Sequence, residues 1–314
     1  MLYVTTRDQK DAFTAHRALS NDLAPDGGRF IPFKMPTFDQ EYLAELKDKA
    51  FGQIVSEIIN TFFSVGLSGW DVDFCIGKIP VQLFSMNHRV CVSENWHNSM
   101  SAYNHSLESI NNKICKNNNL PTSWFATSVR IAYLFAIYGQ MLSQDLIAPG
   151  TTFDVAVNGD DFSDPMAAWY ARKMGLPIEN IICTCVDNSV VWDLLNKGSF
   201  SGGHIDKQLQ LSLEQLLCGA LGHNVAVEFF RAASDGRGYS ICEALLPELN
   251  KGLYCAVVGK DRADTTINSV YRSNGYVLDQ GAALSYGGMQ DYRAKTGSTS
   301  MTLVLSDAKP RNHV

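Results

Sequence analysis

The stretch TTFDVAVNGDDFSDPMAAWYARKMGLPIENIICTCV, residues 151–186, carries the clearest fold signal in the sequence. Its apolar run at 152–157 predicts a buried strand, which the polar loop NGDDFSD at 158–164 follows. A helix is expected from Pro165, because proline favours the first helical position. A second apolar run at 180–186 predicts the next strand. Two strands joined by a helix are typical of a parallel pair.

The same alternation continues to the C-terminus. Apolar segments predict strands at 253–259 and 301–306, and helical periodicity predicts helices at 189–198, 210–221, 239–252, 262–275 and 282–295. In the first half of the chain we expect a helix at 38–63, a hairpin at 81–92 and helices at 98–115 and 123–142. This order of elements predicts an α/β fold with a mostly parallel sheet flanked by helices.

Ligands of such sheets bind at the carboxyl ends of the strands. This rule points to the loop 158–164 and to Ser306 and Asp307, which close the last expected strand.

Three aspartates in that loop, Asp160, Asp161 and Asp164, spell D-D-x-x-D and could hold Mg²⁺. The alternative is that Ser163 or Asp164 caps the following helix and the other aspartates are solvated. Short acidic motifs occur often without a metal, so the alternative is favoured.

The composition is that of an ordinary globular protein, with 314 residues and 18% charged residues. The net charge of −6 and the lack of a basic segment argue against a nucleic-acid partner. No apolar run approaches the roughly 18 residues of a membrane span. The N-terminus lacks the pattern of a secretory signal, so a cytoplasmic location is expected.

The sequence has eight cysteines and no C-x-x-C motif. Cys183 and Cys185 stand two apart in an apolar run, so we expect them on one face of a strand in the core. A zinc site is conceivable at His88, Cys91, His97 and His105, but their spacing fits no standard ligand pattern.

Several segments resemble the threonine synthase family of fold-type-II pyridoxal-phosphate (PLP) enzymes. YVTTRDQKDAFTAHRALSNDLAPDGGRFIP at 3–32 resembles the family's YxSTRG-like strand and its LAPDGGLYVP turn. Residues 167–200 resemble its AGYYAKKMGLPI…TNENDIL…TG block, and residues 271–279 and 301–310 resemble its GYLIDPHTAV and VVLSTASP segments. The resemblance implies the fold of the family's large lobe and, as the family reaction, conversion of O-phosphohomoserine to L-threonine.

The resemblance also locates the family's Schiff-base lysine, in a segment like LWHGPTxAFKDxALQ. Its best match is NWHNSMSAYNHSLES at 95–109, with Trp96 and His97 on the tryptophan–histidine pair and Asn104 in place of the lysine. An asparagine amide is not nucleophilic, so this match implies that covalent catalysis is lost. If the alignment is slipped, Lys113 or Lys78 takes the lysine's role.

The family's phosphate loop, which reads like GNFGN, is replaced here by Gly159, Asp160, Asp161, Phe162 and Ser163. An aspartate within ~4 Å of a phosphate charge costs about 4 kcal/mol at an effective dielectric of about 20. The benefit of a helix N-terminus is only roughly 0.3–2 kcal/mol. We therefore expect no PLP binding, unless a cation intervenes.

Two other family positions differ less clearly. Asp307 replaces the threonine that holds the pyridine nitrogen, which an aspartate could also hold. Arg130 still matches the arginine that binds the substrate phosphate.

Residues 122–141 resemble SINWARILPQIVYYF, which in the family lies a whole lobe further along. The smaller lobe is therefore expected to be missing around Lys116–Asn119. We expect an N-terminal region, 1–116, and an α/β core region, 120–314, which together form one compact unit.

These departures predict a threonine synthase-like protein without PLP chemistry, acting as a pseudoenzyme that binds a small metabolite or a protein partner. A repurposed, Mg²⁺-dependent enzyme and an active threonine synthase are the alternatives. Loss of a lobe exposes apolar surface, so a homo-oligomer is also expected.

Overall fold

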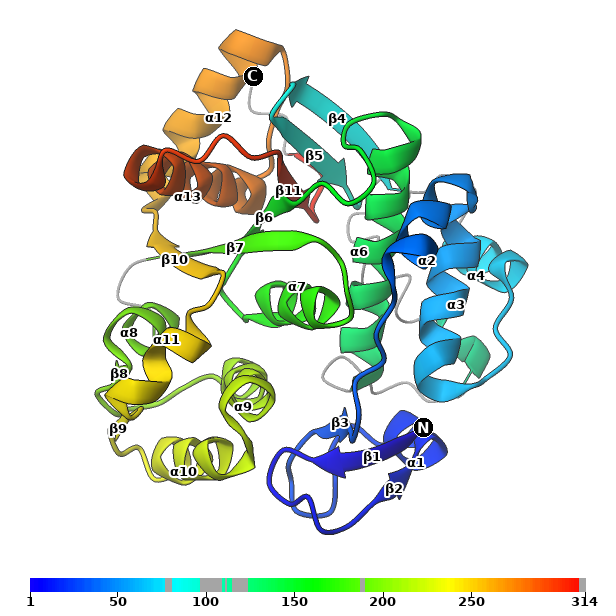
Figure 1. The fold of residues 1–314 in the computed structure, drawn as a ribbon. Coiled ribbons are helices and arrows are strands. Elements are labelled where there is room, and N and C mark those ends of the chain that lie inside the picture. The colour runs from blue at the N-terminus through cyan, green and yellow to red at the C-terminus, as the bar shows by residue number, and fades with distance from the viewer. Residues whose placement is uncertain (77–80, 97–108, 111, 115–123, 187–189, 311–314) are drawn as a thin grey trace.

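A computed structural model describes residues 1–76, 81–96, 109–110, 112–114, 124–186 and 190–310. At its centre lies a six-stranded sheet in the order β10-β7-β6-β11-β5-β4 (Figure 1). The strands are β4 (Gln82–Asn87), β5 (Val90–Glu94), β6 (Phe153–Asn158), β7 (Ile178–Cys185), β10 (Leu253–Val257) and β11 (Thr302–Ser306). β4 is antiparallel to β5, and the other neighbours are parallel. The predicted α/β fold and the hairpin at 81–92 are confirmed.

Helices cover both faces of this sheet. Ala156 and Ile182 belong to the apolar cluster under α13 (Gln280–Thr296), which α12 (Lys260–Asn274) flanks. The preceding residues, Val155 and Ile181, belong to the larger core with α6 (Trp124–Ser143), α7 (Ser163–Lys173) and α8 (Val190–Lys197). Since alternate side chains of a strand point to opposite faces, a continuous apolar run fills both layers.

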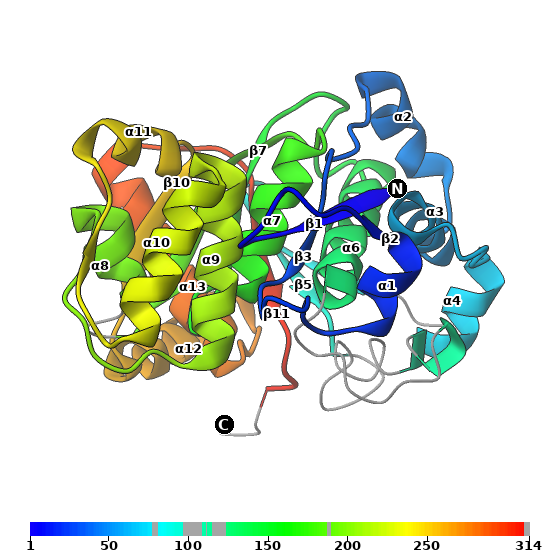
Figure 2. The ribbon, with the colours of Figure 1, turned by 90° about the horizontal axis from the view of Figure 1, so that it is seen from below.

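The other elements surround this centre. A small antiparallel sheet contains β1 (Leu2–Thr5), β2 (Phe13–Thr14) and β3 (Phe30–Pro32), and another contains β8 (Ser199–Phe200) and β9 (Tyr239–Ser240). Further helices in the described residues are α1 (Ala15–Ser20), α2 (Gln40–Glu45), η1 (Leu46–Asp48), α3 (Phe51–Phe63), α4 (Gly69–Ile76), α9 (Lys207–Leu221), α10 (His223–Ser234), η2 (Glu243–Leu245) and α11 (Leu246–Leu249). Figure 2 shows β1 extending toward α9.

Three expected helices differ in detail from the structure. The helix predicted at 38–63 is split by extended backbone at Lys49 and Ala50, so that α2, η1 and α3 are separate. The helix predicted at 239–252 is reduced to η2 (Glu243–Leu245) and the four-residue α11 (Leu246–Leu249). Its first residues pair as a strand, and Pro247 lacks the N–H that a continuous α-helix would use. α7 begins at Ser163, two residues before Pro165.

One apolar core joins the first and last parts of the chain. Phe62 of α3 packs edge-on against Trp124 of α6, with ring centroids 5.6 Å apart, and both belong to the larger core cluster. The division between 116 and 120, and most of the helix expected at 98–115, lie outside the described residues. The domain boundary therefore stays a prediction.

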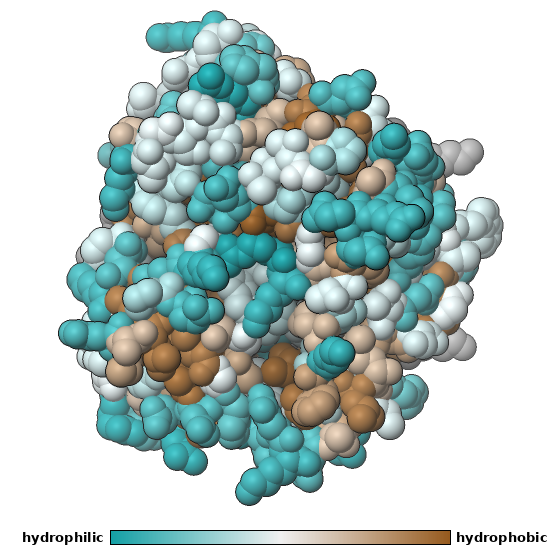
Figure 3. All heavy atoms as spheres, in the orientation of Figure 1, coloured by the Kyte–Doolittle hydropathy of each residue, from teal (hydrophilic) through white to brown (hydrophobic). Residues whose placement is uncertain are grey.

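The surface is mixed in character. On the face drawn in Figure 3, hydrophobic patches are separated by hydrophilic side chains. Among the described helices, none is both long enough and apolar enough to cross a membrane.

Candidate functional site

A group of polar side chains gathers at the carboxyl end of β11. Ser306 Oγ donates a hydrogen bond of 2.5 Å to Asp279 Oδ2 and accepts one of 3.1 Å from Trp96 Nε1. Asp279 is also the N-cap of α13, where its Oδ1 accepts from the backbone N–H groups of Gly281 and Ala282. The segment after β5 is thereby fixed to the segment before α13.

Asp307 continues this group toward α6 and α7. Its Oδ1 accepts a hydrogen bond of 2.7 Å from Asn95 Nδ2, and its carboxyl group contacts that of Asp164. Asp164 Oδ1 in turn lies 2.9 Å from Nε of Arg130. Both side chains of this ion pair are only 16% exposed. The structure thus brings together Arg130, Asp164 and Asp307, which come from three distant parts of the sequence.

The two carboxyl groups hold a proton more tightly than exposed aspartates do. Burial, and then the charge of Asp307, raises the pKa of Asp164 to about 7, although Arg130 opposes the shift. Burial also raises the pKa of Asp307, against the hydrogen bond from Asn95. Two carboxylates in contact cannot both ionise easily, so the pair retains a proton into the neutral range.

The loop between β6 and α7 is closed by its own side chains. Asp161 Oδ1 accepts from the backbone N–H of Ser163 at 2.8 Å, and Asp160 exchanges hydrogen bonds with Asn158. The expectation that Ser163 or Asp164 caps α7 is wrong: the N-cap residue is Phe162, and Asp161 supplies the carboxylate. The cause is the left-handed backbone of Phe162, at φ 59°, which turns Asp161 back onto the helix start.

The three loop aspartates therefore have different partners. Asp160 contacts Asn158, Asp161 contacts Ser163, and Asp164 contacts Arg130. They do not form a converged ligand group within the described part of the chain. The predicted Mg²⁺ site stays a prediction to which this geometry gives no support.

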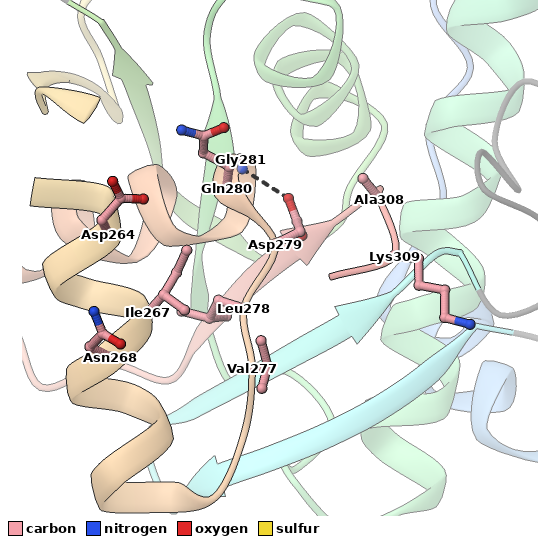
Figure 4. Close-up of a pocket in the computed structure, with 10 residues that line it drawn as sticks. All are labelled: Asp264, Ile267, Asn268, Val277, Leu278, Asp279, Gln280, Gly281, Ala308 and Lys309. Atoms are coloured by element: carbon pink, nitrogen blue, oxygen red, sulfur yellow. Dashed lines mark hydrogen bonds between the residues drawn. The ribbon is translucent and has the colours of Figure 1, made fainter. Parts of the chain in front are cut away.

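A cavity of about 630 Å³ lies next to this group, between α12 and the start of α13 (Figure 4). Its polar lining includes Asp264 and Asn268 of α12, Gln280, and Lys309 beyond β11. Asp279 lines it as well, so the cavity is continuous with the Ser306 hydrogen-bond group.

Several predicted positions cannot be placed. Asn104, His97, His105 and Lys78 lie outside the described residues. Of the four residues considered for a zinc site, His88 lies in the turn of the β4–β5 hairpin and Cys91 is buried in β5. Because the other two residues are not described, the zinc site stays untested. Lys113, the other possible lysine, forms an ion pair with Asp71 of α4 and lies over the rings of Trp70 and Phe74.

A family model matches about the first quarter of the chain, and individual relatives match about half of it. Residues 2–78 match the family model described as the threonine synthase N terminus. Threonine synthase-like 1 from Homo sapiens is 26% identical over 176 residues, 52% of this chain and 24% of that protein. The chain is thus similar to proteins of the threonine synthase family over these segments. Threonine synthase from Pseudomonas aeruginosa is 24% identical over 191 residues, 58% of this chain and 40% of that protein.

Solved threonine synthases share the fold. PLP-bound threonine synthase from Brucella melitensis superposes with a TM-score of 0.83 at 18% identity, covering 99% of this chain and 89% of that one. The yeast enzyme gives a TM-score of 0.81 at 15% identity, covering 98% and 87%. The match to threonine synthase-like 1, by contrast, spans only about a quarter of that relative. The missing smaller lobe stays a prediction, because its junction at Lys116–Asn119 lies outside the described residues.

The residues present do not fit the PLP phosphate that the threonine synthase family implies. A phosphate cradle needs helix N–H groups directed at the ligand. Here the N–H of Ser163 is already taken by the Asp161 carboxylate, and Asp164 is the second residue of the same helix. An additional anion would meet these carboxyl groups rather than donors.

Proposed function

We propose that this chain is a non-catalytic threonine synthase-family protein that has lost PLP binding and binds a small metabolite. The observation that carries the proposal is the Arg130–Asp164 ion pair beside Asp307. Arg130, the residue that corresponds to the family's phosphate-binding arginine, forms an ion pair with a carboxylate of the same chain. A substrate phosphate would need that positive charge for itself. The replacement of the expected lysine by Asn104 in the sequence supports the same conclusion.

The loss of affinity for a phosphate group can be estimated from charge repulsion. A carboxylate within ~4 Å of a phosphate opposes it by about 4 kcal/mol at an effective dielectric of about 20. Such a cost corresponds to roughly a thousandfold loss of affinity, since each 1.4 kcal/mol is about tenfold. Even with Asp164 protonated, Asp161 still occupies the helix N–H that would receive the phosphate.

The metabolite suited to this site is small, polar and free of phosphate. The cavity beside Asp279 has carboxylate and amide groups from Asp264, Asn268 and Gln280 along its wall. These groups accept hydrogen bonds from hydroxyl and ammonium groups. An amino alcohol or a hydroxylated amino acid has donors of this kind. The ammonium group of Lys309, at the edge of the cavity, can pair with the carboxylate of an amino acid.

Thermal unfolding with and without compounds tests the proposal. PLP, O-phosphohomoserine and inorganic phosphate should leave the melting temperature unchanged, whereas homoserine or a related amino alcohol should raise it. Asp264→Asn should weaken that response. Asp261→Asn, an exposed change on the same helix outside the cavity, should not. Stabilisation by PLP, or by O-phosphohomoserine but not by homoserine, would reject the proposal.

Two predictions from the sequence are tested separately. Calorimetric titration with Mg²⁺ decides whether the loop aspartates serve a repurposed, metal-dependent enzyme, and absence of heat would end that alternative. Sedimentation over a range of concentrations decides whether the chain forms a homo-oligomer, and a strictly monomeric profile would refute it.

A further inference from the structure

Three cysteine thiols converge beneath the loop between β6 and α7. Cys183 and Cys185 come from β7, and Cys255 comes from the adjacent parallel strand β10 (Figure 1). Cys255 is paired in register with Cys183, and Cys185 follows two residues later on the same face. The three sulfur atoms all lie within 4.8 Å of one another.

We infer that these thiols form a site for one thiophilic cation with a filled d shell, Zn²⁺ or Cu⁺. Soft thiolate ligands select these ions over Mg²⁺ and Ca²⁺, whose preferred ligands are oxygens. The site is separate from the carboxylate group around Asp164 and does not depend on the proposed metabolite-binding function.

The spacing of the sulfur atoms suits a metal centre. With Zn–S bonds of about 2.3 Å and tetrahedral angles, two ligand sulfurs are about 3.8 Å apart. The Sγ atoms of Cys185 and Cys255 are 3.7 Å apart. Closing the third sulfur onto the same ion requires only side-chain movement, because the strand register already places all three on one face.

The surroundings of the thiols favour an ion that is held by sulfur. The three residues are at most 5% exposed and belong to the larger apolar core. Among the described residues, these three cysteines are the group of potential metal ligands whose ligand atoms all lie close enough together to hold one ion. Three protein ligands leave a fourth position of a tetrahedral zinc for water.

Gly159 closes the site from the loop side. A Cβ atom at this position would collide with Sγ of Cys183 and lie 2.9 Å from Sγ of Cys185. The glycine backbone therefore rests directly on the sulfur atoms, and its neighbour Asp160 is exposed to solvent.

Metal binding to the reduced, metal-free protein tests the site. Dialysis against Zn²⁺ should leave one ion per chain, and X-ray absorption should show about three sulfur ligands at about 2.3 Å. Titration with Cu⁺ against a competing chelator distinguishes the two ions by affinity. A shell of only nitrogen and oxygen ligands for zinc, together with no Cu⁺ retention, would overturn the inference.

Matched variants add a test of the ligands. Cys255→Ser should lower the affinity for the bound ion at least roughly tenfold, since a thiolate ligand is lost. Cys91→Ser changes a buried cysteine of the same sheet outside the cluster and should leave the affinity unchanged. Equal affinities in the two variants would overturn the inference. X-ray absorption of the unaltered protein decides the matter if either variant fails to fold.

Discussion

Arg130 and Asp164 form an ion pair of 2.9 Å that joins the first half of α6 to the first turn of α7. Asp164 contacts Asp307 on its other side, at the end of β11. A cation and two carboxyl groups thus lie together at the carboxyl edge of the sheet. The arrangement compensates the charge of Arg130 within the chain, and it leaves one proton shared among the acids.

Stability should depend on pH through Asp164. Its folded-state pKa of about 7 lies above the roughly 4 of an unfolded aspartate. Below pH about 4 both states hold the proton, and between about 4 and about 7 only the folded state does. The stabilisation from this group is therefore complete below pH about 4 and lost as the pH rises through about 7. One pKa unit corresponds to about 1.4 kcal/mol, so the loss is on the order of a few kcal/mol.

Urea unfolding at several pH values measures this effect. The free energy of unfolding of the unaltered protein, minus that of Asp164→Asn, should decrease as the pH is raised from about 4 to about 7. Asp235→Asn, at a side chain that is 60% exposed, is the control for removing an exposed carboxyl group. A pH-independent difference for Asp164→Asn would show that its carboxyl group titrates normally.

The packing of the N-terminal sheet (β1, β2 and β3) against α9 should depend on another buried carboxylate. Glu214 of α9 is fully buried and accepts from Nε and Nη2 of Arg7 at 3.0 and 3.1 Å, and from the hydroxyl of Thr6. Arg7→Met leaves this carboxylate without its cation, which typically costs about 3–5 kcal/mol.

An exposed ion pair provides the control for that prediction. Arg237→Met breaks the pair with Asp235, whose side chains are 64% and 60% exposed, and should cost less than about 1 kcal/mol. Denaturant unfolding measures both. Similar losses in the two variants would mean that Arg7 contributes little to holding the N-terminal sheet against α9.

Gly159 should tolerate no side chain. Gly159→Ala places a methyl group against Cys183 and Cys185 and should destabilise the fold by about 1–3 kcal/mol through overpacking. Gly259→Ala is the control, because a Cβ there meets no atom within 4 Å. As Gly259 is the N-cap of α12, a cost of up to about 1 kcal/mol is expected. Thermal unfolding compares them, and an equal or smaller loss at position 159 would contradict the packing described.

The sheet could be predicted from sequence because its strands are continuous apolar runs between helices of the right period. The helix at 38–63 could not be divided correctly, since its break at Lys49 and Ala50 lacks proline or glycine. There the need to bury both Leu46 and Phe51 overrides local helical preference.

The candidate site was only partly accessible from the sequence. The rule for strand ends pointed to the loop and to Ser306 and Asp307, but pairing of Arg130 with Asp164 depends on how α6 crosses α7. Asp279 had a local signal, as an N-cap residue before a helical segment. Convergence of Cys255 on Cys183 requires strand register across 72 positions, which spacing alone does not supply.

Absorption spectroscopy of the purified protein with PLP tests most directly whether the family's cofactor chemistry is lost. The mixture is treated with borohydride, digested and mapped for modified peptides. If the acidic site and Asn104 exclude the cofactor, the spectrum is that of free PLP and no single lysine peptide is labelled. A new absorption band that borohydride fixes onto one specific lysine would contradict this conclusion and restore the enzyme interpretation.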